Sequence, residues 1–283
     1  MNPEKLRLEN HLKFLPRLRD PFLNPETLAE IESYIHHSFE SYGYEVTRSP
    51  FEFQGQTFYN LLARKNLTSE SPRFIIAAHF DAVPGTPGAD DNASGTACLL
   101  EAARCLAETS AVSQLEFAAF NLEEYGLVGS SAYVRHLKQS NTTLKGMISL
   151  EMVGYTDHRK GSQQLPAVLK PFYPDTGDFI ALIGDTGSKK LLQTCAQSFK
   201  TIAGLPVQSL TVPFKGRILP ATRLSDHAPF WDKGYPALLI TDTSFFRNPH
   251  YHTPEDTLST LDMDFITQVT AAVCHLAKKM TGF

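Results

Sequence analysis

No stretch of this sequence approaches the run of about 18 apolar residues that a membrane-spanning helix needs, so we expect no membrane span. The start of the chain, MNPEKLRLENHLKFL, contains no uninterrupted apolar core and does not predict a secretory signal peptide. Basic residues are not in excess, because 26 Lys and Arg stand against 30 Asp and Glu. The net charge of −4 argues against a nucleic-acid partner. These absences predict a cytoplasmic protein with neither a membrane nor a nucleic-acid partner.

Cysteine is scarce too. The four cysteines, Cys98, Cys105, Cys195 and Cys274, lie mostly in helical patterns and lack the close spacing of a zinc knuckle or a CxxC redox motif. We interpret them as small buried or half-buried thiols of a protein from a reducing compartment. There is no internal repeat or low-complexity tract. The length of 283 residues, 42% of them hydrophobic, fits one large domain, or one domain with an insertion.

Apolar runs of strand length alternate with segments of helical periodicity. The runs predict strands over 73–78, 114–121, 145–150, 179–184 and 236–241, after an opening hairpin of 44–53 and 57–64. Helices are predicted over 4–15, 25–43, 92–108, 127–138, 188–200 and 227–233, with a last one capped by Asp262; Asp226 is expected to cap the helix at 227. This alternation predicts an α/β fold: a mixed, mostly parallel central β-sheet with helices on both faces.

Three predicted strands are followed by imidazole or acidic side chains: His79, the pair Glu123–Glu124, and Glu151. Ligands of open α/β sheets bind beyond the carboxyl ends of the strands, so these side chains should converge in space. Two more candidates lie in loops. Asp91 stands at the start of a helical pattern, and a histidine lies in the Pro-bounded loop 248–257. Asp81 is placed to accept a hydrogen bond from the other ring nitrogen of His79.

Two imidazoles and three carboxylates, without thiolate, are too negative a set to stay unpaired in a dry site. Zinc accepts nitrogen and oxygen ligands and leaves positions open in catalytic sites. Two ions about 3.5–4 Å apart need a bridging carboxylate and a bridging water. Asp91 suits the bridge because its side chain is short and lies near a helix start. Each ion would then take one histidine and one further carboxylate.

Glu123 and Glu124 are adjacent, so their side chains diverge at the strand end. This predicts a division of labour in which one binds metal and the other takes a proton from the bridging water as the general base. Spacing alone leaves both assignments open.

Six motifs, in order, resemble those of the M28 family of zinc peptidases, which includes bacterial leucyl-type aminopeptidases and aminopeptidase Y: HFD, GADDNASG, NLEEYG, SLEMVGY, SDHAPFWD and NPHYHTPEDT. The resemblance runs from about Asn60 to the terminal helix. It implies a single peptidase domain over residues 1–283, with the fold of zinc-dependent exopeptidases, described as phosphorylase/hydrolase-like.

The resemblance also implies two zinc ions per chain. It assigns the metal ligands: His79 and Glu151 to one ion, Glu124 and His252 to the other, and Asp91 as the bridge. It makes Glu123 the general base and Asp81 the residue that orients His79, and it leaves His250 outside the ligand set. Glu151 stands where many members have Asp, and the peptide bond from Asp91 to Asn92 is expected to be cis.

The implied activity is that of an aminopeptidase, which hydrolyses N-terminal residues from peptides with a bridging water and Glu123 as the base. The alternatives are a glutaminyl-peptide cyclotransferase, a glutamate-carboxypeptidase-like relative, and a non-catalytic binding protein. The segments 154–178 and 212–226 are expected to rim the site. Four of their residues are candidates for an apolar wall of the substrate pocket: Phe172, Tyr173, Phe214 and Leu219. Lys215, Arg217 and Arg223 are candidate receptors of a substrate carboxylate, although a solvated basic stretch explains them as well. The sequence predicts no oligomeric state.

Overall fold

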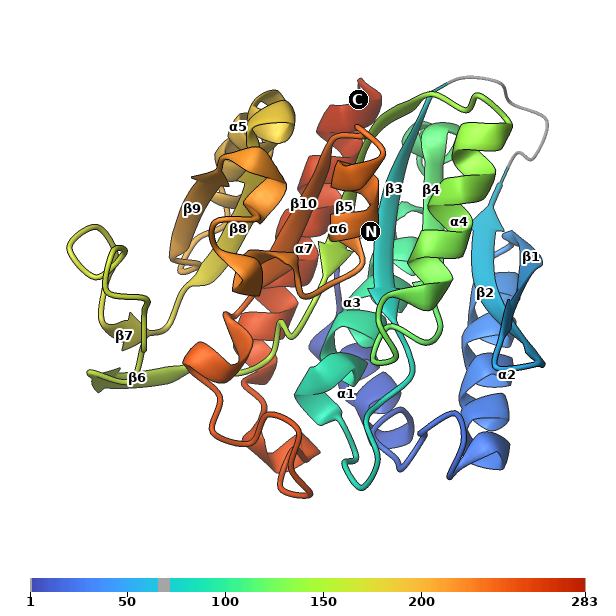
Figure 1. Ribbon diagram of the computed structural model, residues 1–283, viewed down its shortest axis with the longest axis horizontal. Helices are drawn as coiled ribbons and strands as arrows, with labels where there is room; N and C mark the ends of the chain where they lie inside the picture. Colours follow the sequence, from blue (N-terminus) through green and yellow to red (C-terminus); the bar gives the residue numbers. More distant parts are fainter. Residues whose placement is uncertain (1, 66–71, 283) are drawn as a thin grey trace.

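The computed structural model describes residues 2–65 and 72–282; residues 1, 66–71 and 283 of the predicted domain lie outside the described part. An eight-stranded sheet crosses its middle in the order β1-β2-β4-β3-β5-β10-β8-β9 (Figure 1). The strands are β1 (Glu45–Phe53), β2 (Gln56–Arg64), β3 (Arg73–His79), β4 (Leu115–Phe120), β5 (Leu144–Leu150), β8 (Ile180–Asp185), β9 (Val207–Val212) and β10 (Ala237–Thr241).

Strand direction is mixed, as the sequence predicts. β3 pairs in parallel with both β4 and β5, and β5 pairs in parallel with β10. β8 and β9 are parallel to each other, and β8 runs antiparallel to β10. The opening hairpin, β1 with β2, joins the sheet antiparallel to β4. The carboxyl ends of β3, β4, β5 and β10 therefore meet at one edge of the sheet.

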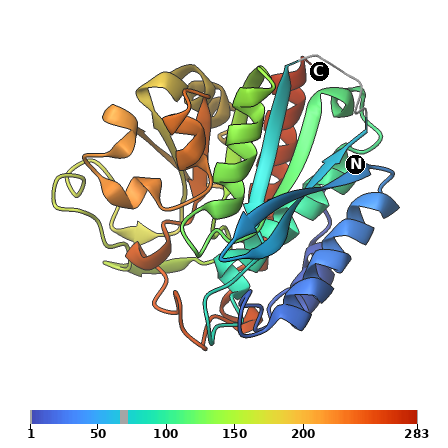
Figure 2. The same cartoon turned by 45° about the vertical axis from the view of Figure 1, so that its right-hand side comes forward.

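Helices cover both faces of this sheet (Figures 1 and 2). They are α1 (Lys5–Phe14), α2 (Pro25–Ser41), α3 (Gly95–Leu106), α4 (Val128–Gln139), α5 (Lys189–Phe199), α6 (His227–Asp232) and α7 (Met263–Thr281). One apolar cluster holds side chains of α1, α2, α3, α5 and α7, and a second lies under α4 and α6. Alternate residues of β3 serve the two clusters, Phe74 and Ile76 on one face and Ile75 and Ala77 on the other.

Some expectations need correction. The edge strand β9 carries no strong sequence signal, because most of its residues are only half-buried or exposed. Segment 154–178 contains a small two-stranded sheet, β6 (Asp157–Lys160) with β7 (Thr176–Gly177), which projects from the main body (Figure 1). Asp226 precedes α6 but makes no side-chain cap bond, since its backbone is already helical and its carboxylate is fully buried. The Asp262 cap is confirmed: its carboxylate accepts hydrogen bonds from two amides of α7.

The four cysteines are all buried and free. Among the helices of the described residues, none combines the length and the apolar character that a bilayer crossing requires.

Candidate metal centre

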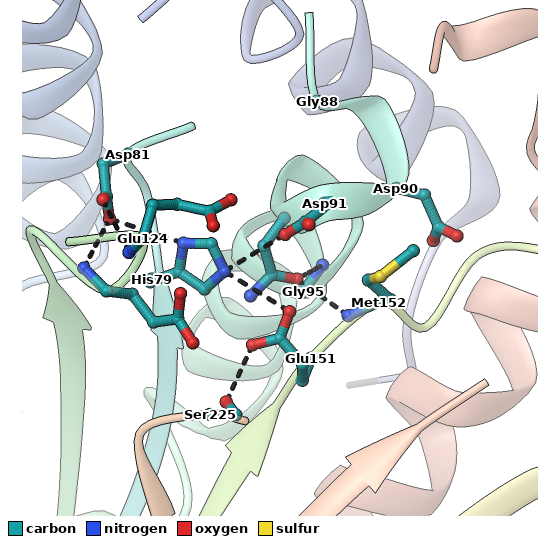
Figure 3. A network of polar contacts seen from close by, with 12 residues as sticks. His79, Asp81, Gly88, Asp90, Asp91, Gly95, Glu124, Glu151, Met152 and Ser225 are labelled. Carbon is teal, nitrogen blue, oxygen red and sulfur yellow. Dashed lines mark hydrogen bonds and ion pairs between the residues drawn. The ribbon is translucent and has the colours of Figure 1, made fainter. Parts of the chain in front are cut away.

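Side chains from the end of β3 and from the loops that follow β3, β4 and β5 meet beyond the carboxyl edge of the sheet (Figure 3). His79 is the last residue of β3 and is 1% exposed. Its backbone is held by the sheet, and its carbonyl accepts a hydrogen bond from the Thr96 hydroxyl at 2.8 Å. A ring at the end of a buried central strand has a fixed position, which is what a metal ligand needs.

Asp91 lies between the two histidines. One of its oxygens, Oδ1, is 3.3 Å from His79 Nε2, and the other, Oδ2, is 3.0 Å from His252 Nε2. Each histidine also faces a second carboxylate: His79 Nε2 is 3.4 Å from Glu151 Oε1, and His252 Nε2 is 3.4 Å from Glu124 Oε2. The five predicted ligands thus form two imidazole–carboxylate pairs on either side of one shared carboxylate. The peptide bond after Asp91 is cis, as the resemblance implies.

Asp81 has more partners than the sequence suggests. Its Oδ1 is 3.4 Å from His79 Nδ1, which is a loose contact. The same carboxylate accepts hydrogen bonds from the backbone N–H groups of Glu123 and Glu124, at 3.1 and 3.2 Å (Figure 3). Asp81 therefore ties the loop after β4 to the end of β3, and it faces the first imidazole at the same time.

Glu151 follows β5, and the Ser225 side chain fixes its orientation. The Ser225 hydroxyl donates a hydrogen bond of 2.7 Å to Glu151 Oε2 (Figure 3). This leaves Oε1 facing His79. Ser225, Asp226 and His227 do not form a catalytic triad, because the His227 ring turns away and its Nε2 lies 2.9 Å from the Thr222 carbonyl.

Asp256 joins the loop of Asp91 to the loop of His252. Its carboxylate accepts hydrogen bonds from the backbone amides of Asp90 and Asp91, at 2.9 and 3.1 Å. His252 lies four residues before it, with 32% of its side chain exposed and its ring stacked on Tyr251 at 3.7 Å. Sequence reasoning found neither Asp256 nor Tyr251 as a site residue, although both lie inside the NPHYHTPEDT motif.

Electrostatics of the cluster favour bound positive charge. Burial raises the pKa of Glu124 to about 7, and the neighbouring Asp91 adds to this shift. Burial likewise raises the pKa of Glu123 well above its ordinary value. Burial alone would lower the pKa of His252, yet hydrogen bonds to Asp91 and Glu124 outweigh it and raise the pKa to about 10. The acid-rich cluster thus stabilises positive charge near His252, a role that a bound metal ion fills when the imidazole is its neutral ligand.

The donor set fits a metal. Two of its buried carboxylate oxygens, Asp91 Oδ1 and Glu124 Oε1, have no hydrogen-bond partner within the described residues. Two groups offer three donor atoms within 4.8 Å of one another: His79 with Glu123 and Glu151, and His79 with Asp91 and Glu124. Imidazole nitrogen and carboxylate oxygen together suit zinc. Because Glu123 falls in one of these groups, distance alone does not separate the expected base from the ligands.

The cluster opens into an apolar pocket of about 270 Å³. Four of the site acids line it. Most of its apolar side chains come from β8, β9 and the segments 154–178 and 212–226. The apolar lining includes Leu165, Leu169, Phe179, Ile183, Leu210 and Leu219. Two of the four expected wall residues, Tyr173 and Leu219, line this pocket. The other two do not, because Phe172 and Phe214 are 77% and 71% exposed.

Neither the three candidate cations nor His250 is among the described residues that line this pocket. Lys215 and Arg223 line other hollows of the surface, and Arg223 donates to Asp232 at 2.7 Å. The His250 ring packs edge-on to Tyr155, 6.1 Å between centroids. Its exclusion from the ligand set remains a prediction. A mixed α/β sheet with imidazoles and carboxylates gathered at its strand ends is typical of proteins that bind metal ions at that edge.

Comparison with known proteins gives the family. The model of peptidase family M28 matches residues 60–277. The protein YfbL of Escherichia coli (strain K12), described as uncharacterized, is 34% identical over 97% of this chain and 87% of its own length. The chain therefore belongs to peptidase family M28 and is a metallopeptidase.

Two relatives with a named activity match this chain over a smaller share of their own length. Aminopeptidase YwaD of Bacillus subtilis (strain 168) is 31% identical over 83% of this chain, but the match covers 48% of YwaD. The solved structure of BSAP, a zinc aminopeptidase from Bacillus subtilis, is 28% identical with a TM-score of 0.61, over 80% of this chain and 51% of that one. The chain thus spans about half the length of these two proteins.

The fold is shared more widely than the activity. Glutaminyl cyclase from Macrostomum lignano has a TM-score of 0.76 at 19% identity, over 99% of this chain and 90% of its own. At that identity the likeness concerns the fold alone. The fold alone therefore does not distinguish hydrolysis from cyclisation.

Proposed function

We propose that this protein is a zinc-dependent aminopeptidase that removes N-terminal residues from peptides. The observation that carries the proposal is the charge of the pocket. Its lining includes four carboxylates, Asp91, Glu123, Glu124 and Glu151, and no Lys, Arg or His among the described residues that line it. Three of these carboxylates are the proposed zinc ligands, so the metal offsets their charge; a C-terminal carboxylate of a substrate would find no basic side chain in this lining to pair with. This favours an aminopeptidase over a carboxypeptidase-like enzyme.

We assign the ligands as two pairs that share one carboxylate. His79 and Glu151 would hold one zinc ion, Glu124 and His252 the other, and Asp91 would be common to both. The separation of the two Asp91 oxygens toward different histidines supports this pairing, and the zinc aminopeptidase from Bacillus subtilis supports the choice of metal. When bound, zinc supplies Lewis-acid polarisation of the scissile carbonyl and lowers the pKa of the attacking water.

Glu123 is the residue that moves the proton. Its burial keeps the pKa high, so that Glu123 can take a proton from the attacking water and then give it to the leaving amine. Asp81 holds the backbone of Glu123 and Glu124 and faces His79, so it acts as a positioning residue. The two neighbouring glutamates thereby keep separate tasks.

The pocket predicts the preferred substrate. Its walls are leucine, isoleucine and phenylalanine side chains, so we propose that the N-terminal residue of the substrate is large and apolar. We also propose that residues 1–283 form one domain. Leu8 of α1 and Leu276 of α7 belong to the same apolar cluster, which supports this assignment.

The test is a panel of aminoacyl anilides, with zinc measured before and after chelation. We expect hydrolysis of leucyl and phenylalanyl anilides, loss of activity on chelation, and recovery with zinc. N-acetyl-leucyl anilide is the matched control, since it lacks the free amine. Cleavage of the acetylated compound at the same rate, or pyroglutamate formation from glutaminyl peptides as the main activity, would refute the proposal.

Glu123→Gln separates base from ligand. If Glu123 is the base, the variant keeps its zinc and loses about 10²–10⁴-fold in kcat, the usual contribution of a general base. The control is Glu255→Gln, the same change at an exposed glutamate of the loop that carries His252. Loss of zinc from Glu123→Gln would make Glu123 a ligand, and unchanged turnover would remove it from the mechanism.

A further inference from the structure

The loop between α1 and α2 carries a buried arginine that the catalytic proposal does not use. Arg19 is 1% exposed, although it belongs to neither a helix nor a strand. Its guanidinium has five N–H groups in a fixed planar arrangement. Such a group is rarely buried unless all its donors are satisfied.

Every donor of Arg19 meets a backbone carbonyl. Nε donates to Phe80 at 2.8 Å, and Nη2 donates to Gly88 at 2.9 Å and to Asp91 at 3.3 Å. Nη1 donates to Pro87 and, at 3.2 Å, to Arg17. Four of these five acceptors belong to the segment from Phe80 to Asp91, which follows His79, and His79 and Asp91 are the first two proposed ligands. One side chain thus fixes both ends of the loop that joins them.

Gly88 shows how closely the arginine fits this loop. It adopts a left-handed backbone conformation, with φ of 58°. A Cβ there would lie 2.1 Å from the Asp91 carbonyl oxygen and 2.9 Å from Arg19 Nη2. The carbonyls of Gly88 and Asp91 can therefore both approach the guanidinium only because residue 88 has no side chain.

The next residue, Asp20, holds the second ligand loop. Its Oδ2 accepts a hydrogen bond of 2.5 Å from the hydroxyl of Tyr125, which follows Glu124. Its Oδ1 accepts from the amides of Phe22 and Leu23, at 2.9 and 2.7 Å, and this fixes its orientation. The Phe22 ring packs edge-on against Tyr125, 5.0 Å between centroids. Tyr125 is thus held at its hydroxyl and at its ring.

We propose that Arg19 and Asp20 are positioning residues of the metal centre: Arg19 fixes the backbone from Phe80 to Asp91, and Asp20 fixes Tyr125 beside Glu124. Both lie before residue 60, where the match to the family model begins. Neither contacts a ligand side chain, so they act through the main chain that carries the ligands. The inference rests on the proposed metal site and adds to it the device that sets its geometry.

Arg19→Lys is the sharpest variant, because it keeps the charge and reduces five N–H donors to three. At least two of the carbonyls then lose their partner. We expect zinc affinity, measured by competition with a chelator, to fall about 10- to 100-fold, as for other residues that orient metal ligands. We expect kcat to fall and KM to stay within about twofold, since Arg19 does not line the substrate pocket. Arg17→Lys is the control, because the Arg17 side chain pairs with Glu30 near the surface.

Tyr125→Phe tests the second half of the proposal by removing only the hydroxyl that reaches Asp20. It should weaken zinc binding in the same direction as Arg19→Lys. Tyr235→Phe is the matched control, because that hydroxyl donates to the Thr142 carbonyl, away from the centre.

Each outcome decides the inference. If wild-type protein binds no zinc, the proposed function fails. If wild-type protein binds zinc and Arg19→Lys binds it equally well or more tightly, the positioning role fails and the proposed function stands. Urea unfolding of the metal-free proteins separates general stability from positioning. An Arg19→Lys protein that is destabilised but has unchanged zinc affinity, or that does not fold at all, would make the arginine a general structural residue and overturn the proposal.

Discussion

Asp81→Asn should damage catalysis more than its small change in shape suggests. Both oxygens of the wild-type carboxylate accept backbone N–H groups, from Glu123 at 3.1 Å and from Glu124 at 3.2 Å. Asparagine has one acceptor oxygen, and its amide group would face the other N–H as a second donor. One of the two glutamates therefore loses its backbone anchor.

The size of the effect follows from this one bond. A hydrogen bond to a charged group contributes about 1.5–3 kcal/mol. If the whole amount is lost in the transition state, kcat falls about 10- to 150-fold, because each 1.36 kcal/mol is a factor of ten. The loss of the charge that faces His79 acts in the same direction, since Asp81 Oδ1 is 3.4 Å from His79 Nδ1.

Steady-state kinetics of the zinc-loaded variant, with urea unfolding alongside, provide the assay. Asp185→Asn is the control, because Asp185 is also a buried carboxylate that accepts a backbone amide, from Ser188 at 2.9 Å, but it lies at the far end of β8 from the cluster. Asp185→Asn should lose stability and keep kcat. A kcat for Asp81→Asn equal to that of Asp185→Asn would refute the reasoning.

Two further predictions concern the pocket and the pH dependence of stability. Leu219→Glu places a charge in the apolar pocket wall, and kcat/KM for leucyl anilide should fall at least about tenfold relative to that for lysyl anilide; an unchanged ratio would remove Leu219 from the pocket. His11 is 6% exposed, and burial lowers its pKa from 6.5 to about 4. As pH falls, the unfolded chain therefore takes up a proton at His11 before the folded protein does. The stability that neutral, buried His11 contributes is present above pH 6.5 and is lost as pH falls toward 4. Between pH 7.5 and 5 this costs about 2 kcal/mol, which His11→Gln should not show in urea unfolding at the two pH values; an equal loss in both proteins would contradict the pKa shift.

The strand-end residues of the cluster could be predicted from the sequence because a buried strand fixes the position of the residue that ends or follows it. His79 and Glu151 come directly from this rule, Asp91 comes from its place at a helix start, and the resemblance selects His252. The hairpin, the parallel strands and the terminal helix with its Asp262 cap also follow from apolar periodicity and capping residues.

Other parts of the site leave no local trace. In the sequence, Arg19 resembles any basic residue of a loop, because four of its five partners are carbonyls 61 to 72 residues away. Carbonyls are present at every position, so no side-chain pattern marks them. Ser225 and Asp256 are equally hard to find from the sequence. Ser225 acts on Glu151, which is distant in the chain, and Asp256 acts on the backbone amides of Asp90 and Asp91. The edge strand β9 is short and half-exposed, and it has too little apolar alternation to be distinguished from a loop.

Zinc content per chain distinguishes a shared two-ion site from any simpler arrangement. Elemental analysis of the wild-type protein after zinc loading and dialysis should give two zinc ions per chain, and Asp91→Ala should retain fewer than one, because both ions share that carboxylate. Metal-stripped wild-type protein should be inactive on leucyl anilide and should recover with added zinc. Full activity in the metal-stripped protein, or two retained zinc ions in Asp91→Ala, would contradict the account.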